Sequence, residues 1–227
     1  MCDIGTNGEI ALWKDGVLSV TSTAAGPAFE GAKISCGMRG AEGAVDHVTY
    51  EKGEIRWHTI GDAAPKGLCG SGLLDLVAVL LDAGIVDESG YMEDSAYTLC
   101  ENVTLTQKDV REVQLAKAAI RAGIELLCRQ LGVEVSDIKQ VCLAGAFGNY
   151  MNPASACRIG MIPPVLQDRI EPIGNAAGQG AILCALSRKE FTYSQELAKH
   201  TDFLELASLP DFQDCYVDAL EFEEEEE

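Results

Sequence analysis

The chain has 227 residues, of which 47% are hydrophobic and 23% charged, a composition typical of one large or two small globular domains. Its formal net charge of −19 would repel a phosphate backbone, which disfavours nucleic acid as a partner. No apolar stretch reaches the roughly 18–20 residues that span a bilayer, and the first residues do not resemble a secretory signal, so we expect a cytoplasmic protein with no membrane partner.

Two β-hairpins are predicted in the first third of the chain. Residues 9–13 (EIALW) and 17–23 (VLSVTST) flank an Asp-Gly pair, which favours a tight hairpin turn. Residues 45–60 repeat this pattern around the turn EKGE. The stretch between the hairpins, residues 24–40, is rich in glycine and small residues, and it predicts a loop with one helical turn.

Two helices are predicted in the middle of the chain. Residues 67–87 have a glycine-rich start and a periodic apolar body that ends at a glycine. Residues 105–132 predict the clearest helix, with Thr106 as the N-cap and Asp109, three residues on, as its capping partner. A broad apolar face follows, and Gly132 ends the helix.

The last third of the chain alternates between strands and helices. Residues 137–150 predict a strand that runs into a glycine turn, and residues 153–163 predict a short helix. Residues 169–187 hold a strand end, a turn and a Gly/Ala-rich helix. Further on, residues 202–207 predict an edge strand and residues 209–220 a final short helix. This repetition indicates an α/β fold, a mixed sheet with helices packed on it.

Nine cysteines are scattered along the chain, and no two form a CxxC pair. Their odd number and their mostly apolar contexts are typical of free thiols in a reducing compartment. We therefore do not expect a metal or iron–sulfur site built from this chain alone, because the ligand spacing of such sites is absent.

Four glycine-rich turns could surround an anion with backbone N–H groups: residues 3–9 (DIGTNGE), 67–72 (GLCGSG), 143–148 (LAGAFG) and 173–180 (IGNAAGQG). Glycine lets a phosphate approach the backbone, and helix N-termini add positive potential. Asp3 suits a hydrated Mg²⁺, which prefers oxygen ligands. A single short glycine turn is more often only a connection between a strand and a helix. The first and third of these turns, however, follow one another in the order seen in the nucleotide-binding halves of the actin-like kinase superfamily.

Long blocks of the chain resemble the C-terminal part of the reductive activators of corrinoid proteins, also called activating enzymes of corrinoid-dependent methyltransferases. The resemblance covers the chain from Cys2 to about Phe222. It implies the ribonuclease-H-like half of the actin-like ATPase superfamily, which includes acetate and sugar kinases, heat-shock chaperones and actin. The blocks are DIGTNGEIAL, STAAGPAFEGAKISCGMRG, KGLCGSGLLDLVAVLLDAGIVDESG, LTQKDVREVQLAKAAIRAGIELL, LAGAFGNYMNP and IGNAAGQGA.

The resemblance implies an ATP-dependent activase that drives the one-electron reduction of cob(II)amide to cob(I)amide on a partner corrinoid protein. The implied cofactors are ATP and Mg²⁺, with an iron–sulfur cluster only in another domain of the parent protein. The implied partners are the corrinoid protein of a methyltransferase system and the remaining domains of the parent chain, and a homodimer is one further assembly to consider.

The resemblance also implies roles for residues in three of the glycine turns. Asp3, in the turn that resembles the second phosphate motif, would act in catalysis and hold Mg²⁺ through water. In the turn that resembles the second connecting motif, Gly174, Ala177 and Gly178 would let two helices cross at a hinge. The residues that would bind the phosphates and the nucleoside are Gly5, Thr6, Asn7, Gly8, Gly145, Ala146, Phe147 and Gly148.

Four further candidates each have a plainer alternative. Gln114 and Lys117 loosely fit nucleoside contacts of related chaperones, or else they lie on a solvated helix face. Glu30 is a candidate catalytic acid that positions water or Mg²⁺, or else a surface acid. Arg39 faces phosphate or a partner protein, or else forms a surface salt bridge. The three histidines receive no role: His47, His58 and His200.

The sequence lacks the first phosphate motif and the cluster-binding cysteines of the family, so we expect an incomplete fragment that binds nucleotide weakly. Residues 1–190 would form the second half of the ATPase fold, residues 191–220 an extension packed on it, and residues 221–227 an acidic, disordered tail. Two alternatives remain, a non-catalytic docking domain for the corrinoid protein and an activator of a 2-hydroxyacyl-CoA dehydratase type of enzyme.

Overall fold

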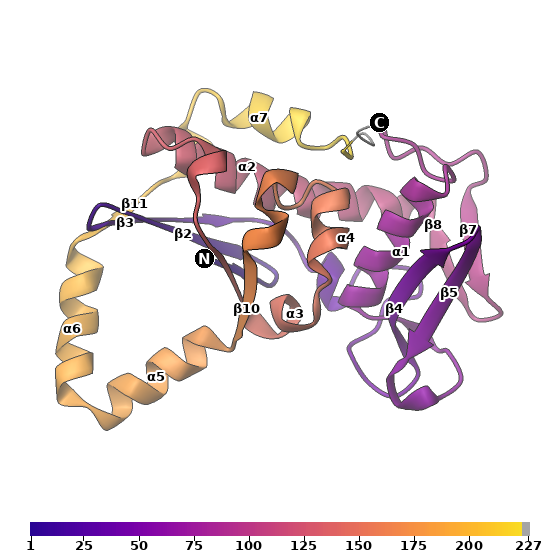
Figure 1. The fold of residues 1–227 in the computed structure, drawn as a ribbon, viewed down its shortest axis with the longest axis horizontal. Helices are drawn as coiled ribbons and strands as arrows, with labels where there is room; N and C mark the ends of the chain where they lie inside the picture. Colours follow the sequence, from indigo (N-terminus) through magenta and orange to yellow (C-terminus); the bar gives the residue numbers. More distant parts are fainter. Residues whose placement is uncertain (224–227) are drawn as a thin grey trace.

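A computed structural model describes residues 1–223 of the chain. Six strands form the main sheet, in the order β10-β9-β1-β2-β3-β11 (Figure 1). The bounds of these strands are β1 Cys2–Ile4, β2 Gly8–Lys14, β3 Val17–Thr23, β9 Val141–Ala144, β10 Ile170–Gly174 and β11 Thr201–Phe203. Strands β1, β9 and β10 run parallel, so their carboxyl ends meet at one edge of the sheet.

Both predicted hairpins are confirmed. Strands β2 and β3 pair antiparallel across a turn in which Asp15 and Gly16 both have positive φ, as a tight primed turn requires. Strands β4 (Ala44–Glu51) and β5 (Glu54–Thr59) pair across Lys52 and Gly53, which also have positive φ. Together with β6 (Gly67–Leu68), which runs parallel to β4, they form a separate three-stranded sheet.

Helices α1 (Gly70–Asp82) and α2 (Gln107–Gln130) supply much of the hydrophobic core, and both were predicted. The capping box that Thr106 and Asp109 form begins α2 as expected. The helix lies close to the sheet at Gly123, where an added Cβ would come within 2.6 Å of side chains of β2 and β3. Any larger residue here would push α2 off the sheet.

A two-stranded ribbon and two short helices complete the body of the molecule. The pattern of residues 91–105 predicts no element, yet β7 (Ala96–Cys100) and β8 (Val103–Thr106) pair antiparallel just before α2. After β9 the chain turns directly into the helix α3 rather than through a longer glycine turn. The bounds of the short helices are α3 Gly145–Tyr150 and α4 Pro153–Arg158.

Two helices project from the sheet as an arm (Figure 1). Helix α5 (Ala176–Leu186) was predicted and α6 (Arg188–Lys199) was not, and neither has a buried residue. The chain then returns as β11 at the edge of the main sheet and as α7 (Phe212–Asp218), which packs on α2. The boundary expected between residues 190 and 191 therefore falls inside α6. Within residues 1–223, no helix is both long and apolar enough to cross a membrane.

The first three residues of the expected acidic tail contact the body of the protein. Residues 221–223 are docked on the body of the protein, and the side chain of Phe222 is only 3% exposed. Its burial among apolar side chains explains the order at this position, because the acidic neighbours alone would favour a solvated end. Residues 224–227, the rest of the predicted tail, lie outside the described part of the chain.

Candidate functional site

The turns that follow β1 and β9 meet at one edge of the main sheet. Asp3 and Ala144 are register partners in the parallel pair of β1 and β9, which brings Asp3 beside Gly145. An ideal Cβ on Gly145 would lie 2.5 Å from Asp3 Oδ1, and the φ of Gly145 is +85°. Only glycine fits here without strain, so the contact between the two turns depends on it.

The loop after β3 closes over the first of these turns. The hydroxyl of Thr6 donates to Glu30 Oε1 at 2.5 Å, and the N–H of Gly26 donates to the Thr6 carbonyl at 2.8 Å. The N–H of Gly5 donates to the Asn7 carbonyl at 2.9 Å. The structure therefore places Glu30 beside the turn of residues 3–9, and its role as a catalytic acid stays a prediction.

An aromatic pair links the turn after β9 to the loop after β3. The rings of Phe147 and Phe29 stack with their centroids 4.8 Å apart. Gly70, at the start of α1, lies so close to both that an added Cβ would come within 2.9 Å of the Phe147 ring. The glycine-rich turn of residues 67–72, expected either to surround an anion or only to begin a helix, thus lies beside the turns that follow β1 and β9.

A cavity of about 670 Å³ opens beside these turns. This volume is within the range of small-molecule sites in proteins. Most of its lining is apolar, and Arg39 and Glu30 bring a cation and an anion to its wall. The other lining residues are Phe29, Met38, Gly40, Asp46, His47, Ile60, Cys69, Gly70, Ser71, Ala146, Phe147 and Tyr150.

A buried carboxylate holds one histidine at the wall of this cavity. Asp75 is 1% exposed, and its Oδ2 lies 3.3 Å from Nδ1 of His47, while its Oδ1 accepts from the hydroxyl of Ser155 at 2.6 Å. Burial raises the pKa of Asp75 above its usual range, and the hydrogen bond from Ser155 opposes this shift. Asp75 thus ties α1 to both β4 and α4.

A second histidine lies next to the first. The rings of His47 and His58 have centroids 6.5 Å apart, and His58 Nδ1 lies 2.7 Å from Asp46 Oδ1. This hydrogen bond raises the pKa of His58 above its ordinary value. A register shift in the β4–β5 pairing between Val45 and His47 lets two successive residues, Asp46 and His47, reach the cavity.

Gln114 and Lys117 of α2 make other contacts. Gln114 Nε2 donates to the carbonyls of Ser89 and Leu220, at 3.0 and 2.9 Å. Lys117 is 1% exposed and donates to the carbonyl of Glu221. Neither residue lines the 670 Å³ cavity, so their expected contact with a nucleoside stays a prediction.

The fourth glycine turn lies after β10, at the base of the arm. Gly174 has a φ of +68°, and the N–H of Gly178 donates to Asn175 Oδ1 at 2.8 Å, which caps α5. Gly174 and Ala177 have no close packing partner within the described chain that would require a small residue at either position. The hinge role of this turn therefore stays a prediction as well.

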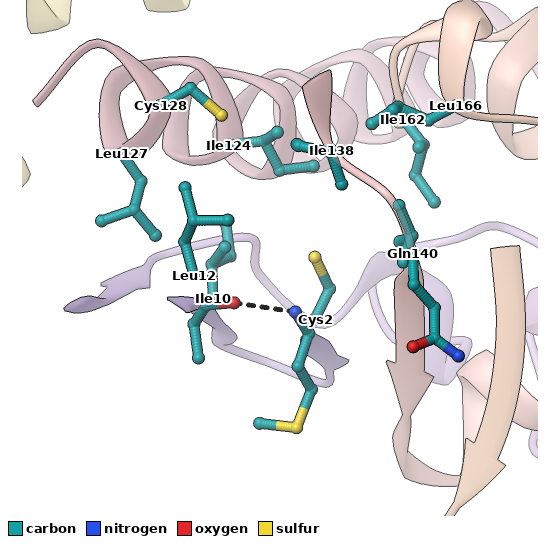
Figure 2. Close-up of a pocket in the computed structure, with 13 residues that line it drawn as sticks. Cys2, Ile10, Leu12, Ile124, Leu127, Cys128, Ile138, Gln140, Ile162 and Leu166 are labelled. Atoms are coloured by element: carbon teal, nitrogen blue, oxygen red, sulfur yellow. Dashed lines mark hydrogen bonds between the residues drawn. The ribbon is translucent and has the colours of Figure 1, made fainter. Parts of the chain in front are cut away.

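A separate small cavity of about 40 Å³ lies beneath β1 and β2 (Figure 2). Figure 2 shows its apolar walls, with the thiols of Cys2 and Cys128 pointing among isoleucine and leucine side chains. Burial raises the pKa of both thiols, that of Cys128 to about 11. Protonated thiols around so small a volume are packing groups, and this cavity is not a ligand site.

Sequence reasoning missed Asp46 and His47, which β4 brings to the cavity. It also missed Asp75 of α1, which is buried behind His47 and contacts its ring. Asp75 had a visible signal, because a carboxylate in the middle of an apolar helix must find partners when it is buried. Nothing in the sequence marked His47 and His58 as site residues, because their position depends on the pairing of β4 with β5 and on a bulge in it.

Comparison with known proteins agrees with this geometry. The family profile described as "C-terminal domain of RACo the ASKHA domain" matches residues 1–227. The solved structure of a "Reductive activator for corrinoid,iron-sulfur protein" superposes with a TM-score of 0.87 at 34% sequence identity, over 97% of this chain and 39% of that chain. The actin-like ATPase fold expected from the sequence is confirmed.

Two curated relatives are similar over nearly all of the chain. The "Corrinoid activation enzyme RamQ" of Eubacterium limosum is 40% identical over 245 residues, which is 96% of this chain and 41% of the relative. The "[Co(II) methylated amine-specific corrinoid protein] reductase" of Methanosarcina barkeri is 29% identical over 246 residues, 97% of this chain and 45% of the relative. The chain thus spans less than half the length of these relatives.

Proposed function

Because the chain belongs to the family of C-terminal ASKHA domains of RACo, we propose that it is the ATP-binding half of a reductive activator of a corrinoid protein. The observation that carries this proposal is the meeting of the turns after β1 and β9 around Asp3 and Gly145. These are the two turns expected to bind the phosphates and the nucleoside of ATP.

The first turn is suited to the phosphates. The Asp3 carboxylate lies at the carboxyl ends of the parallel strands, which is the edge where open α/β sheets bind ligands. The N–H of Gly5 is already bonded within the turn, so the N–H groups of Thr6 and Asn7 are the donors that we assign to phosphate oxygens. Glu30, bonded to Thr6, would orient the water that attacks the terminal phosphate.

The Asp3 carboxylate, whose Oδ1 lies beside Gly145, would offer one oxygen ligand to a Mg²⁺ ion that keeps most of its waters. When bound, Mg²⁺ would neutralise phosphate charge. The turn after β9 would hold the nucleoside. Gly145 would let the nucleotide approach the backbone closely, and stacking on Phe29 fixes the ring of Phe147. Ala146 and Gly148 belong to the same turn.

The named activity of the relatives supports a corrinoid protein as the partner. In the reaction we propose, one electron passes from an iron–sulfur cluster outside this chain to cob(II)amide, which becomes cob(I)amide. The chain's own contribution is to bind ATP and change the geometry of the complex. Glu30, Arg39 and Phe147 line the open cavity next to the nucleotide turns. A change of geometry at the nucleotide would therefore alter the shape of this cavity.

A complete nucleotide cleft needs a second wall, and we assign that wall to residues outside this chain. The relatives are more than twice as long, which leaves ample sequence for it. Calorimetric titration of the 227-residue chain with Mg·ATP should therefore give only weak binding, with a Kd well above about 1 μM. Sub-micromolar binding would contradict the half-site interpretation.

Catalysis and docking can be separated in the full-length parent protein. Asp3→Ala should abolish ATP-driven reduction of the corrinoid protein, followed by the absorbance of the corrinoid, while binding of the partner in pull-down assays persists. Unchanged reduction with intact partner binding would instead favour the alternative of a docking domain with a vestigial nucleotide site. Asp15→Ala, at a hairpin turn away from the site, is the matched control.

A further inference from the structure

The open cavity adjoins both nucleotide turns, those after β1 and β9. Glu30 lines the cavity and accepts from the hydroxyl of Thr6, in the turn after β1, at 2.5 Å. Phe147, in the turn after β9, lines it as well, whereas Asp3 does not. A ligand whose phosphates lie on the turns would therefore extend into this cavity with its other end.

The lining of the cavity suits a flat, partly polar group. The rings of Phe29, Phe147 and Tyr150 provide flat apolar surfaces on its wall. A volume of about 670 Å³ has room for a nucleoside. Aromatic side chains stack on any nucleobase, because every base has a flat π-face. Stacking alone would thus hold a base in this cavity without selecting one, and selection needs a polar group.

One polar group of the lining, His47, is held in a fixed orientation by Asp75. Oδ2 of Asp75 lies 3.3 Å from Nδ1 of His47 and accepts from the N–H of Val48 at 3.3 Å. Oδ1 accepts from the hydroxyl of Ser155 at 2.6 Å. Because both carboxylate oxygens accept from these donors, Nδ1 of His47 takes the role of a donor as well. A neutral ring then carries its proton on Nδ1, and Nε2 is left as an acceptor.

The Nε2 atom of His47 is free to meet a ligand. Within residues 1–223 it makes no hydrogen bond, and the ring belongs to the lining of the cavity. The side chain of His47 is 51% exposed, while that of Asp75 is 1% exposed. Since the two nitrogens of an imidazole point in nearly opposite directions, Nε2 faces away from the buried carboxylate. The fold thus presents one oriented acceptor to whatever occupies the cavity.

We propose that His47 determines the base specificity of the nucleotide site by accepting a hydrogen bond from the exocyclic amino group of adenine. This inference rests on the proposed function, since it takes a nucleotide to be the ligand of the two turns. Guanine carries a carbonyl oxygen where adenine carries this amino group, so two acceptors would face each other. The cavity rejects GTP by this mismatch. Asp75 is a positioning residue, which acts through the tautomer of His47.

The base preference can be measured on the full-length parent protein by calorimetric titration with Mg·ATP and Mg·GTP. The wild type should bind Mg·ATP at least about tenfold more tightly than Mg·GTP. His47→Phe keeps a flat ring but removes the acceptor, so it should weaken Mg·ATP binding about tenfold without weakening Mg·GTP binding. His47→Gln, whose amide oxygen can accept, should restore part of the preference. The matched control is His200→Phe, at an exposed position just after α6, which should keep the full preference.

Asp75→Asn tests the positioning role with the same two titrations. The amide of this variant can donate to Nδ1 of His47, which moves the ring proton to Nε2 and turns the acceptor into a donor. Mg·GTP should then bind at least as tightly as Mg·ATP, whereas a general loss of structure would weaken both nucleotides alike. If circular dichroism shows that Asp75→Asn unfolds the protein, His47→Phe at its half-exposed position carries the test.

Two outcomes would overturn the proposal while leaving the proposed function intact. In one, the wild type binds the two nucleotides equally, and in the other, His47→Phe keeps the full preference for Mg·ATP. In both of these cases Asp3→Ala would still abolish reduction of the corrinoid protein. Failure of the proposed function looks different, because the wild type would then bind neither nucleotide, and this result would overturn both.

Discussion

At the scale of single residues, Gly145 is where the two halves of the candidate site touch. Its φ of +85° and the 2.5 Å between an ideal Cβ and Asp3 Oδ1 leave no room for a side chain. Gly145→Ala should therefore lower the free energy of unfolding by about 2–3 kcal/mol, measured by urea denaturation. Displacement of Asp3 should also weaken Mg·ATP binding by the parent protein about tenfold or more.

Gly16 provides the control for this substitution. Its φ is +87°, nearly that of Gly145, but nothing lies within 4 Å of an added Cβ. Gly16→Ala should cost only the backbone strain, about 1–2 kcal/mol, and leave nucleotide binding unchanged. If both variants bind Mg·ATP equally well, the close approach of Gly145 to Asp3 has no role in the site.

The buried ammonium group of Lys117 predicts how stability depends on pH. Its pKa is about 7 in the folded chain, well below its ordinary value, so between pH 7 and about 10 the unfolded state binds more protons. Stability from this group therefore rises with pH across that window. The wild type should gain about 2 kcal/mol of unfolding free energy relative to Lys117→Met between pH 7 and pH 9.

This prediction is checked by urea denaturation at both pH values. Lys139 is exposed, and Lys139→Met should show no such difference from the wild type. The unfolding free energy of the wild type minus that of Lys117→Met should rise with pH. If this difference stays constant or falls, the ammonium group of Lys117 keeps its charge in the folded protein.

At the scale of elements, the start of α2 is fixed by one buried carboxylate. Asp109 is 0% exposed and accepts from the N–H and hydroxyl of Thr106, at 2.8 Å each, and from the N–H of Ser35 at 2.8 Å. Asp109→Ala should cost about 3 kcal/mol, because it leaves buried donors unpaired. Thr106→Ala should cost only about 1 kcal/mol in the same urea experiment.

The comparison separates two roles of Asp109. Thr106→Ala removes only the local cap, whereas Asp109→Ala also frees Ser35 in the loop that leads to Arg39. Equal losses of stability in the two variants would mean that the link between α2 and this loop contributes nothing.

Elements with strong local signals were predictable from the sequence. The turns at Asp15-Gly16 and Lys52-Gly53 predicted the two hairpins, and the capping box of Thr106 and Asp109 predicted the start of α2. The ribbon of β7 and β8 turns without a glycine, and although β8 alternates apolar and polar residues, it has only four residues. Helix α6 is polar on average, and although its apolar residues favour one side, none of them is buried, so packing on the body of the protein does not mark it.

The candidate site was predictable where it consists of loops at strand ends. Asp3 was expected from the chemistry of a carboxylate at a strand end, whereas the roles of Thr6 and Gly145 came from the resemblance to the corrinoid activators. The structure places Asp3 beside Gly145 and Thr6 beside Glu30. The wall that β4 contributes to the 670 Å³ cavity was not predictable, because His47 reaches the cavity only through a bulge in a second sheet. Long-range packing of this kind has no local signature in the chain.

At the scale of the whole molecule, the arm is the feature that the described chain does not explain. Helix α5 is largely apolar and has no buried residue, and Ile182, Leu183 and Leu186 are 59%, 57% and 82% exposed. An apolar helix face of this kind marks an interaction surface in a soluble protein. On the proposal that the chain is one half of a longer activator, we assign the cover of α5 to residues of that protein outside the present chain.

This assignment predicts that one substitution will have two different effects. Leu183→Ala should change the unfolding free energy of the 227-residue chain by less than about 0.5 kcal/mol, because this side chain is 57% exposed there. In the full-length parent protein the same change should cost about 2–4 kcal/mol, since it would leave a cavity in a packed interface. Leu76→Ala, at a 0% exposed position of α1, should cost about 3 kcal/mol in both proteins. A Leu183→Ala variant that is harmless in the full-length protein as well would show that α5 is not covered by the rest of its own chain.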